Sequence, residues 1–187
     1  MRTVLAPRRD LFAAGDPSAA TAALALHYVA LPTTIVESVR ATLKSPRYGH
    51  PVHIEVATSH GPCRHCLRGF VIGRERRILF THDPFDGIES LPLPGPVFIH
   101  AEPCMRYRES GGFPVDLRFH RLTLDAYARG RRLVDEVNVT NGEVDNALER
   151  LFAIPDTDYV HVRDMQAGCY DLRVERAATG CSPTALE

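Results

Sequence analysis

The sequence predicts an α+β fold in which two helices pack on an antiparallel or mixed sheet of short strands. Two stretches place apolar residues at helical spacing, and eight short apolar or alternating runs have the pattern of strands. Glycine and proline residues separate these runs, so turns join most of the predicted strands. Turn-length connections favour antiparallel neighbours, which is why we expect an α+β rather than a parallel α/β architecture.

The chain is long enough for a single domain with its own core, at 187 residues. All the predicted elements lie within residues 23–177, whereas residues 1–22 are rich in Ala, Arg, Pro and Gly and have no sustained periodicity. We therefore expect a loosely ordered leader over 1–22, one domain over 23–177 and a frayed tail over 178–187.

The first half of the chain begins with an apolar run over 24–31, which Pro32 stops, as in a strand. Thr33 or Thr34 can cap a helix that continues to about Lys44. Three further strands are expected over 52–56, 77–82 and 97–101.

A long connection over 83–96 precedes the last of these strands. It contains four prolines and two glycines and is too apolar for a flexible linker, so we expect an ordered loop over a pocket or a sheet edge.

The second half predicts a long strand over 118–128, where Leu122 and Leu124 alternate with polar residues. After a turn, residues 133–139 return as its hairpin partner. The remaining elements are a helix over 144–152 and two closing strands over 159–163 and 170–176.

The overall charge excludes some classes of partner. With 22 basic and 23 acidic residues the net charge is −1, which gives no field that attracts nucleic acid or an anionic membrane. No apolar run approaches the roughly 20 residues that span a bilayer. Arg8, Arg9 and Asp10 interrupt the N-terminal segment, which is unlike a signal peptide. We expect a cytoplasmic protein of undetermined oligomeric state.

The sharpest local motif is Cys63-Arg-His-Cys66. A two-residue gap lets both sulfurs converge on one ion, and zinc is the metal that such a pair most often binds. A structural site needs two more ligands, which must come from elsewhere in the chain. The candidate metal set is Cys63, Cys66, His100 and Cys104.

Two other interpretations of the motif stay open. Cys63 could open a helical turn, where the helix dipole would lower its pKa and favour dithiol redox chemistry. Gly69 and Gly73 interrupt the helix that this interpretation needs. Cys63 and Cys66 could also be small buried residues at a tight turn.

Histidines near predicted strand ends suggest acid–base or anion-binding roles. If the strand at 97–101 continues, His100 and Glu102 share a face and could act as a general acid/base pair. His161 and Arg163 share a face of a later strand and could hold an anion such as a carboxylate. The alternatives are a histidine bonded to a backbone carbonyl and a solvated sheet face.

Several motifs resemble the bacterial DUF1203 family, a family of unknown function, over about residues 23–177. They are Pro62-Cys-Arg-x-x-Leu, Gly95-Pro-Val-Phe-Ile-His-Ala-Glu-Pro-Cys104, Leu151-Phe-x-x-Pro and Tyr159-Val-His-Val-Arg. The resemblance implies a small bacterial cytoplasmic domain and no particular reaction. In that pattern Cys63 and Arg64 are more characteristic than Cys66, which weighs against a site based on Cys66.

Three hypotheses follow. The first is a pocket protein or enzyme for a small, anionic molecule, with Cys63, His100, Cys104 and His161 as catalytic candidates. In that hypothesis the ligand-binding candidates are Arg64, Arg163, Cys169 and Tyr170. The second is a zinc- or iron-binding protein with a site based on Cys63 and Cys66. The third is a non-catalytic interaction or structural domain.

Overall fold

A computed structural model describes residues 24–89 and 93–177; the predicted leader, the predicted tail and Cys181 lie outside them. None of the described helices has the length and apolarity to cross a membrane. The described elements are β1 (Leu26–Val29), α1 (Thr33–Thr42), β2 (His53–Val56), β3 (Arg76–His82), β4 (Gly95–His100), a 3-10 helix (Val115–Leu117), β5 (Leu122–Ala128), β6 (Arg132–Val139), α2 (Val144–Ala153), β7 (Tyr159–Asp164) and β8 (Tyr170–Arg176).

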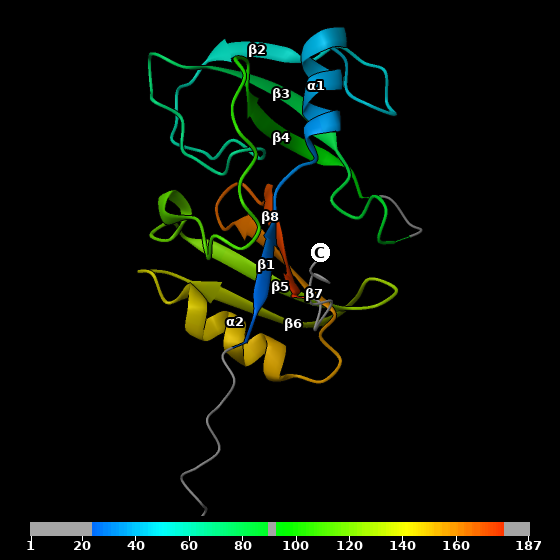
Figure 1. Cartoon of the computed structure of the whole chain (residues 1–187), viewed down its shortest axis with the longest axis vertical. Coiled ribbons are helices and arrows are strands. Elements are labelled where there is room, and N and C mark those ends of the chain that lie inside the picture. Colours follow the sequence, from blue (N-terminus) through cyan, green and yellow to red (C-terminus); the bar gives the residue numbers. More distant parts are fainter. Residues whose placement is uncertain (1–23, 90–92, 178–187) are drawn as a thin grey trace, which may run out of the picture.

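The larger of two sheets has the strand order β1-β8-β7-β5-β6 and is antiparallel throughout. Leu122, Leu124 and Ala126 alternate along β5 and give the sheet one apolar face. The helix α2 lies against that face (Figure 1) and buries Leu148 and Leu151 in the same cluster. Each buried leucine contributes roughly 2 kcal/mol, so this contact is a main source of the layer's stability.

The other face of the larger sheet is polar and aromatic. Side chains alternate along strands, so Asp125 and Tyr127 of β5 lie opposite His161 and Tyr159 of β7 on that face. In Figure 1 α2 covers one side of the sheet, and the smaller layer lies on the other.

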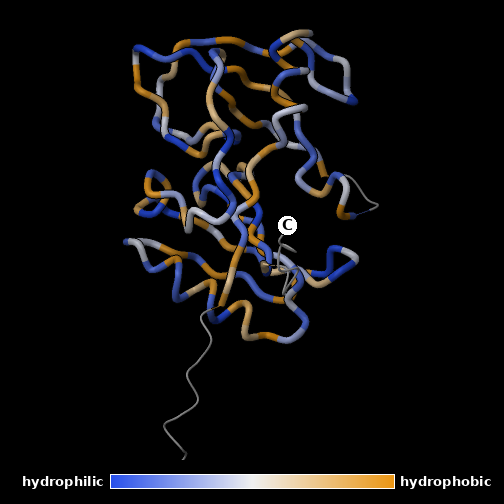
Figure 2. The backbone as a smooth tube through the Cα atoms, viewed as in Figure 1, coloured by the Kyte–Doolittle hydropathy of each residue, from blue (hydrophilic) through white to orange (hydrophobic). Residues whose placement is uncertain are grey.

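The smaller layer consists of the antiparallel sheet β2-β3-β4 with α1 beside it (Figure 1). Val36 and Val39 of α1 pack with Phe80 and Ile99 in a second core cluster. Apolar segments occur in both layers, as Figure 2 shows, so each layer has its own core.

The predicted α+β class with antiparallel pairing and two helices is confirmed. The strands form two sheets rather than one, and each sheet has its own helix. The predicted cap of the first helix is wrong: the N-cap is Pro32, without a side-chain hydrogen bond, and Thr33 is already helical. Proline suits this boundary because it has no N–H to satisfy.

The predicted strand over 118–128 begins four residues late. A 3-10 helix at Val115–Leu117 precedes it, and β5 starts at Leu122, where the buried alternation begins. Arg118 instead pairs with Asp145 of α2. Residues 118–121 extend the alternating pattern of the sequence, but neither neighbouring strand pairs with them, so the sheet begins at Leu122.

Candidate metal centre

A small hairpin presents the two cysteines of the Cys63-Arg-His-Cys66 motif. An isolated β-bridge pairs Pro62 with Gly69, and the amide of Cys63 donates to the carbonyl of Arg68 at 2.9 Å. A tight turn closed by the Leu67 amide and the Cys63 carbonyl (2.8 Å) brings both thiols to one side. No helix follows Cys66, so the geometry of a dithiol at a helix N-terminus is absent from this described segment.

The other two members of the set come from the end of β4. His100 is the last residue of β4, and Cys104 lies four residues later in the loop that follows. The guanidinium of Arg40, on α1, donates to the His100 carbonyl (3.1 and 3.2 Å) and to the Glu102 carbonyl at 2.8 Å. These three bonds fix the path of the chain between His100 and Cys104.

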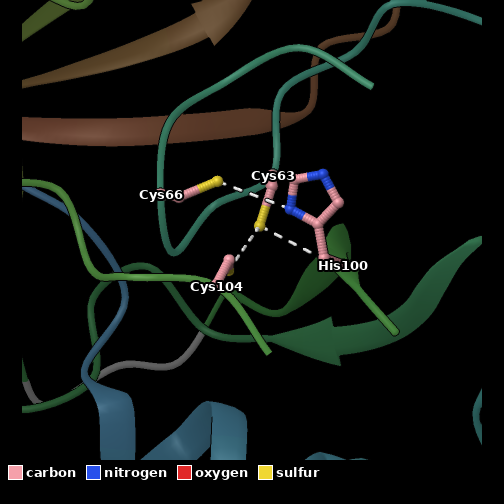
Figure 3. A group of neighbouring side chains, drawn as sticks. All are labelled: Cys63, Cys66, His100 and Cys104. Atoms are coloured by element: carbon pink, nitrogen blue, oxygen red, sulfur yellow. Dashed lines mark hydrogen bonds between the residues drawn. The ribbon is translucent and has the colours of Figure 1, made fainter. Parts of the chain in front are cut away.

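The four side chains converge on a common point (Figure 3). One donor atom from each of Cys63, Cys66, His100 and Cys104 lies within 4.8 Å of every other. The Sγ atoms of Cys63 and Cys104 are 3.9 Å apart, and Sγ of Cys66 is 3.4 Å from Nδ1 of His100. Tetrahedral zinc, with Zn–S near 2.3 Å and Zn–N near 2.0 Å, needs donors roughly 3.5–3.8 Å apart. These two spacings fit a zinc ion, and the widest donor pair, at up to 4.8 Å, would have to close by about 1 Å.

Three of the four candidate ligands are buried, Cys104 is partly buried, and the cluster favours a thiolate at Cys63. Cys63 is fully buried, and Cys66 and His100 are nearly so. Burial alone raises the pKa of Cys63, but hydrogen bonds from Cys104, Cys66 and His100 outweigh it and lower that pKa far below the ordinary value. Hydrogen bonds with Cys104 and then Cys63, followed by burial, raise the pKa of Cys66. One thiolate is therefore stable in the site, whereas the negative charge of the first disfavours a second. A divalent cation would compensate both charges and so stabilise the two thiolates together.

Neighbouring groups orient the four candidate ligands. Nε2 of His100 is 3.3 Å from a carboxylate oxygen of Glu75, which leaves Nδ1 facing the sulfurs. The His100 amide donates to Sγ of Cys63 at 3.3 Å, and Nδ1 of His65 is 3.2 Å from Sγ of Cys104. A carboxylate behind a ligating imidazole is a common support in metal sites.

Replacing Glu75 by glutamine is expected to weaken metal binding by about 10- to 100-fold while leaving the fold intact. The carboxylate holds the His100 ring and increases its basicity, and an amide does this less well. A competition titration with a chromophoric zinc chelator measures the change. Glu55→Gln is the matched control, because Glu55 pairs with Arg77 in the same layer. Equal zinc affinity in the two variants would contradict the assignment.

Of the remaining predicted site residues, all but Arg64 line a different place. His161, Arg163, Cys169 and Tyr170 border a cavity of about 400 Å³ between the polar face of the larger sheet and the loop that follows β3. None of the four candidate metal ligands borders that cavity. The structure therefore divides the predicted residues into two groups instead of one shared pocket.

Both predicted ligand-binding arginines are already paired. Arg163 donates through Nε and Nη2 (the latter at 3.0 Å) to the buried carboxylate of Asp125. Arg64 is 3% exposed, and its Nη2 lies 2.7 Å from a carboxylate oxygen of Asp171. Neither guanidinium presents an uncompensated charge to a ligand.

His161 is a buried neutral base. Burial, followed by the charges of Arg173, His82 and Arg163, lowers its pKa to about 3. Between pH 6.5 and pH 3 the unfolded chain binds a proton at this imidazole and the folded chain does not. The free energy of unfolding that this difference contributes is therefore fully present near pH 7 and decreases as the pH falls.

The variant His161→Phe is therefore expected to be less sensitive to acid than the native protein. Between pH 7 and pH 5 the native chain should lose about 2 kcal/mol more unfolding free energy than the variant. Urea denaturation at the two pH values measures the difference. Identical losses would show that His161 is protonated equally in both states.

Sequence reasoning missed the groups that support the site. Glu75, Arg40 and His65 are 25 to 60 residues from the chain positions that they contact, and no local pattern marks them. The position of Asp125 could be predicted, because the alternation along 122–126 places a polar side chain on the face opposite the leucines. The pairing of Asp125 with Arg163 could not be predicted, because it depends on the register between β5 and β7, which a single sequence does not specify.

A family model described as a protein of unknown function, DUF1203, matches residues 60–176. The matched segment contains all four members of the cysteine–histidine cluster and all the named residues of the cavity. No curated protein and no solved structure matches the chain.

Proposed function

The chain belongs to the DUF1203 family of proteins of unknown function, and we propose that it is a zinc-binding domain whose ion is held by Cys63, Cys66, His100 and Cys104. The observation behind the proposal is the convergence of four donor atoms within 4.8 Å from two segments more than thirty residues apart. Three sulfurs and one imidazole form a donor set typical of zinc.

The donor set points to a structural rather than a catalytic ion. Four protein ligands complete a tetrahedron and leave no position for water or substrate. An open groove lined by Cys66, His100 and Cys104 offers an ion a path to the site. The ion would tie the hairpin of Cys63 and Cys66 to β4, two segments that share only a short stretch of backbone bonding. In this form the metal-binding and the structural hypotheses describe one role.

The hypothesis of an enzyme for small anions has weaker support. The thiols of Cys63 and Cys104 belong to the proposed metal set, and His161 borders a separate cavity. Arg163 and Arg64 are neutralised by Asp125 and Asp171. The dithiol redox interpretation lacks the helix that it requires after Cys66, and the low pKa of the Cys63 thiol comes instead from hydrogen bonds within the cluster.

The test is metal analysis of the full chain, purified without a histidine tag. We expect one zinc per chain and an X-ray absorption spectrum with three sulfur and one nitrogen neighbours. The variant Cys169→Ser is the matched control, because Cys169 is a free cysteine outside the cluster. A chain that takes up no zinc, or zinc with a shell free of sulfur, would contradict the proposal; stoichiometric iron would reassign the metal.

A further inference from the structure

The cavity beside the larger sheet has two chemically different walls. The loop after β3 and the start of β4 form an apolar wall from Phe85, Leu93, Val97 and three prolines, at 84, 94 and 96. The polar face of the sheet forms the other wall, with Asp125, Tyr127, His161 and Arg163. At about 400 Å³ the cavity is within the size range of small-molecule sites.

The His161 ring lies at the centre of an aromatic group. Its centroid is 4.8 Å from that of Phe85, 5.4 Å from Tyr127, 5.1 Å from Tyr159 and 5.2 Å from Tyr170. The residue is 2% exposed, yet its Nε2 has no hydrogen-bond partner among the described residues. A buried polar atom without a partner costs about 1–3 kcal/mol, so this nitrogen needs a partner that the described residues do not supply.

The two charged side chains that line the cavity, Arg163 and Asp125, are paired with each other. Nη2 of Arg163 is also 3.6 Å from a carboxylate oxygen of Glu136, which lies outside the lining. Burial lowers the pKa of His82, which also lines the cavity, to about 4, as it does that of His161 to about 3. Both imidazoles are thus neutral near pH 7, and a charged ligand would lose its hydration without gaining a counter-charge.

We propose that this cavity binds a small, planar, uncharged aromatic molecule that exchanges a hydrogen bond with Nε2 of His161. Aromatic and proline walls favour a flat ring through offset stacking and edge contacts. The unpartnered Nε2 of His161 provides a polar anchor on this wall. The site shares no residue with the proposed zinc site and does not depend on it.

Four probes of similar size separate the contributions of flat rings, a hydroxyl group and charge to binding. 2-Naphthol has the flat rings and a hydroxyl group, naphthalene lacks the hydroxyl, 2-decalol lacks aromaticity, and 2-naphthoate has a negative charge. Binding to the full-length chain is followed by NMR, with the ring nitrogens of His161 as the reporter. We expect 2-naphthol to bind most tightly of the four, about fivefold more tightly than naphthalene. Its binding should also shift the His161 nitrogen resonances.

The variant His161→Phe keeps a ring at this position and removes the nitrogen. It should lose the fivefold preference for 2-naphthol over naphthalene while still binding naphthalene, which shows that the cavity is intact. Three results would overturn the proposal: no probe binds, 2-naphthoate binds at least as well as 2-naphthol, or 2-decalol equals 2-naphthol. If the variant fails to fold, the His161 shifts in the native chain decide alone, since 2-naphthol must move them.

Discussion

Replacing Cys63 by serine is expected to abolish stoichiometric zinc binding and to lower the free energy of unfolding by about 4 kcal/mol in zinc-replete buffer. That value is the stabilisation expected from an ion that binds only the folded chain and is present at a thousand times its dissociation constant. A variant that binds no zinc lacks this stabilisation. Cys63 is fully buried between Cys104 and the His100 amide, at the centre of the cluster. Urea denaturation with and without zinc measures the change.

The control for this prediction is Cys169→Ser, which should keep both the metal and the stability. Cys169 lies outside the cluster, and its thiol has only a weak contact with the Ala167 carbonyl. Chelation of the native chain should reproduce the loss seen in Cys63→Ser, and chelation of that variant should change nothing further. If the native chain and Cys63→Ser unfold at the same urea concentration in zinc buffer, the ion has no structural role.

The elements of this fold were predictable because their signals are local. The alternation of Leu122, Leu124 and Ala126 and the helical spacing in 144–152 each depend on neighbouring residues alone. The division into two sheets was not predictable in this way. It depends on β1 pairing with β8 across about 145 residues and on β3 pairing with β4 across a long loop, and no local pattern specifies either.

The candidate site shows the same limit. The spacing of Cys63 and Cys66 indicates a metal pair, and His100 and Cys104 follow a predicted strand. Their convergence depends on the hairpin at 62–69 crossing the end of β4, through the bond from the Arg64 amide to the Phe98 carbonyl (3.0 Å). The family pattern gave Cys66 less weight than the geometry does.

Replacing Arg64 by alanine is expected to cost about 3–5 kcal/mol, the range for breaking a buried ion pair. Its guanidinium pairs with Asp171 on β8, which is 1% exposed, and also donates to the carbonyls of Pro62 (2.6 Å) and Tyr170 (2.7 Å). The side chain therefore joins the cysteine hairpin to the larger sheet. Its removal leaves the Asp171 carboxylate buried without its counter-charge. Equilibrium urea denaturation at pH 7 measures the loss.

The matched control is Arg132→Ala, whose partner Asp156 is as exposed as Arg132 itself, with both side chains more than half accessible. That pair should contribute less than about 1 kcal/mol. The double variant Arg64→Met, Asp171→Leu removes both charges and should recover much of the loss, because no unpaired charge remains. A cost for Arg64→Ala as small as that for Arg132→Ala would show that the pair does not hold the layers together. Because Arg64 supplies no donor atom to the cluster, its folded variant should still bind one zinc, which separates this junction from the metal centre.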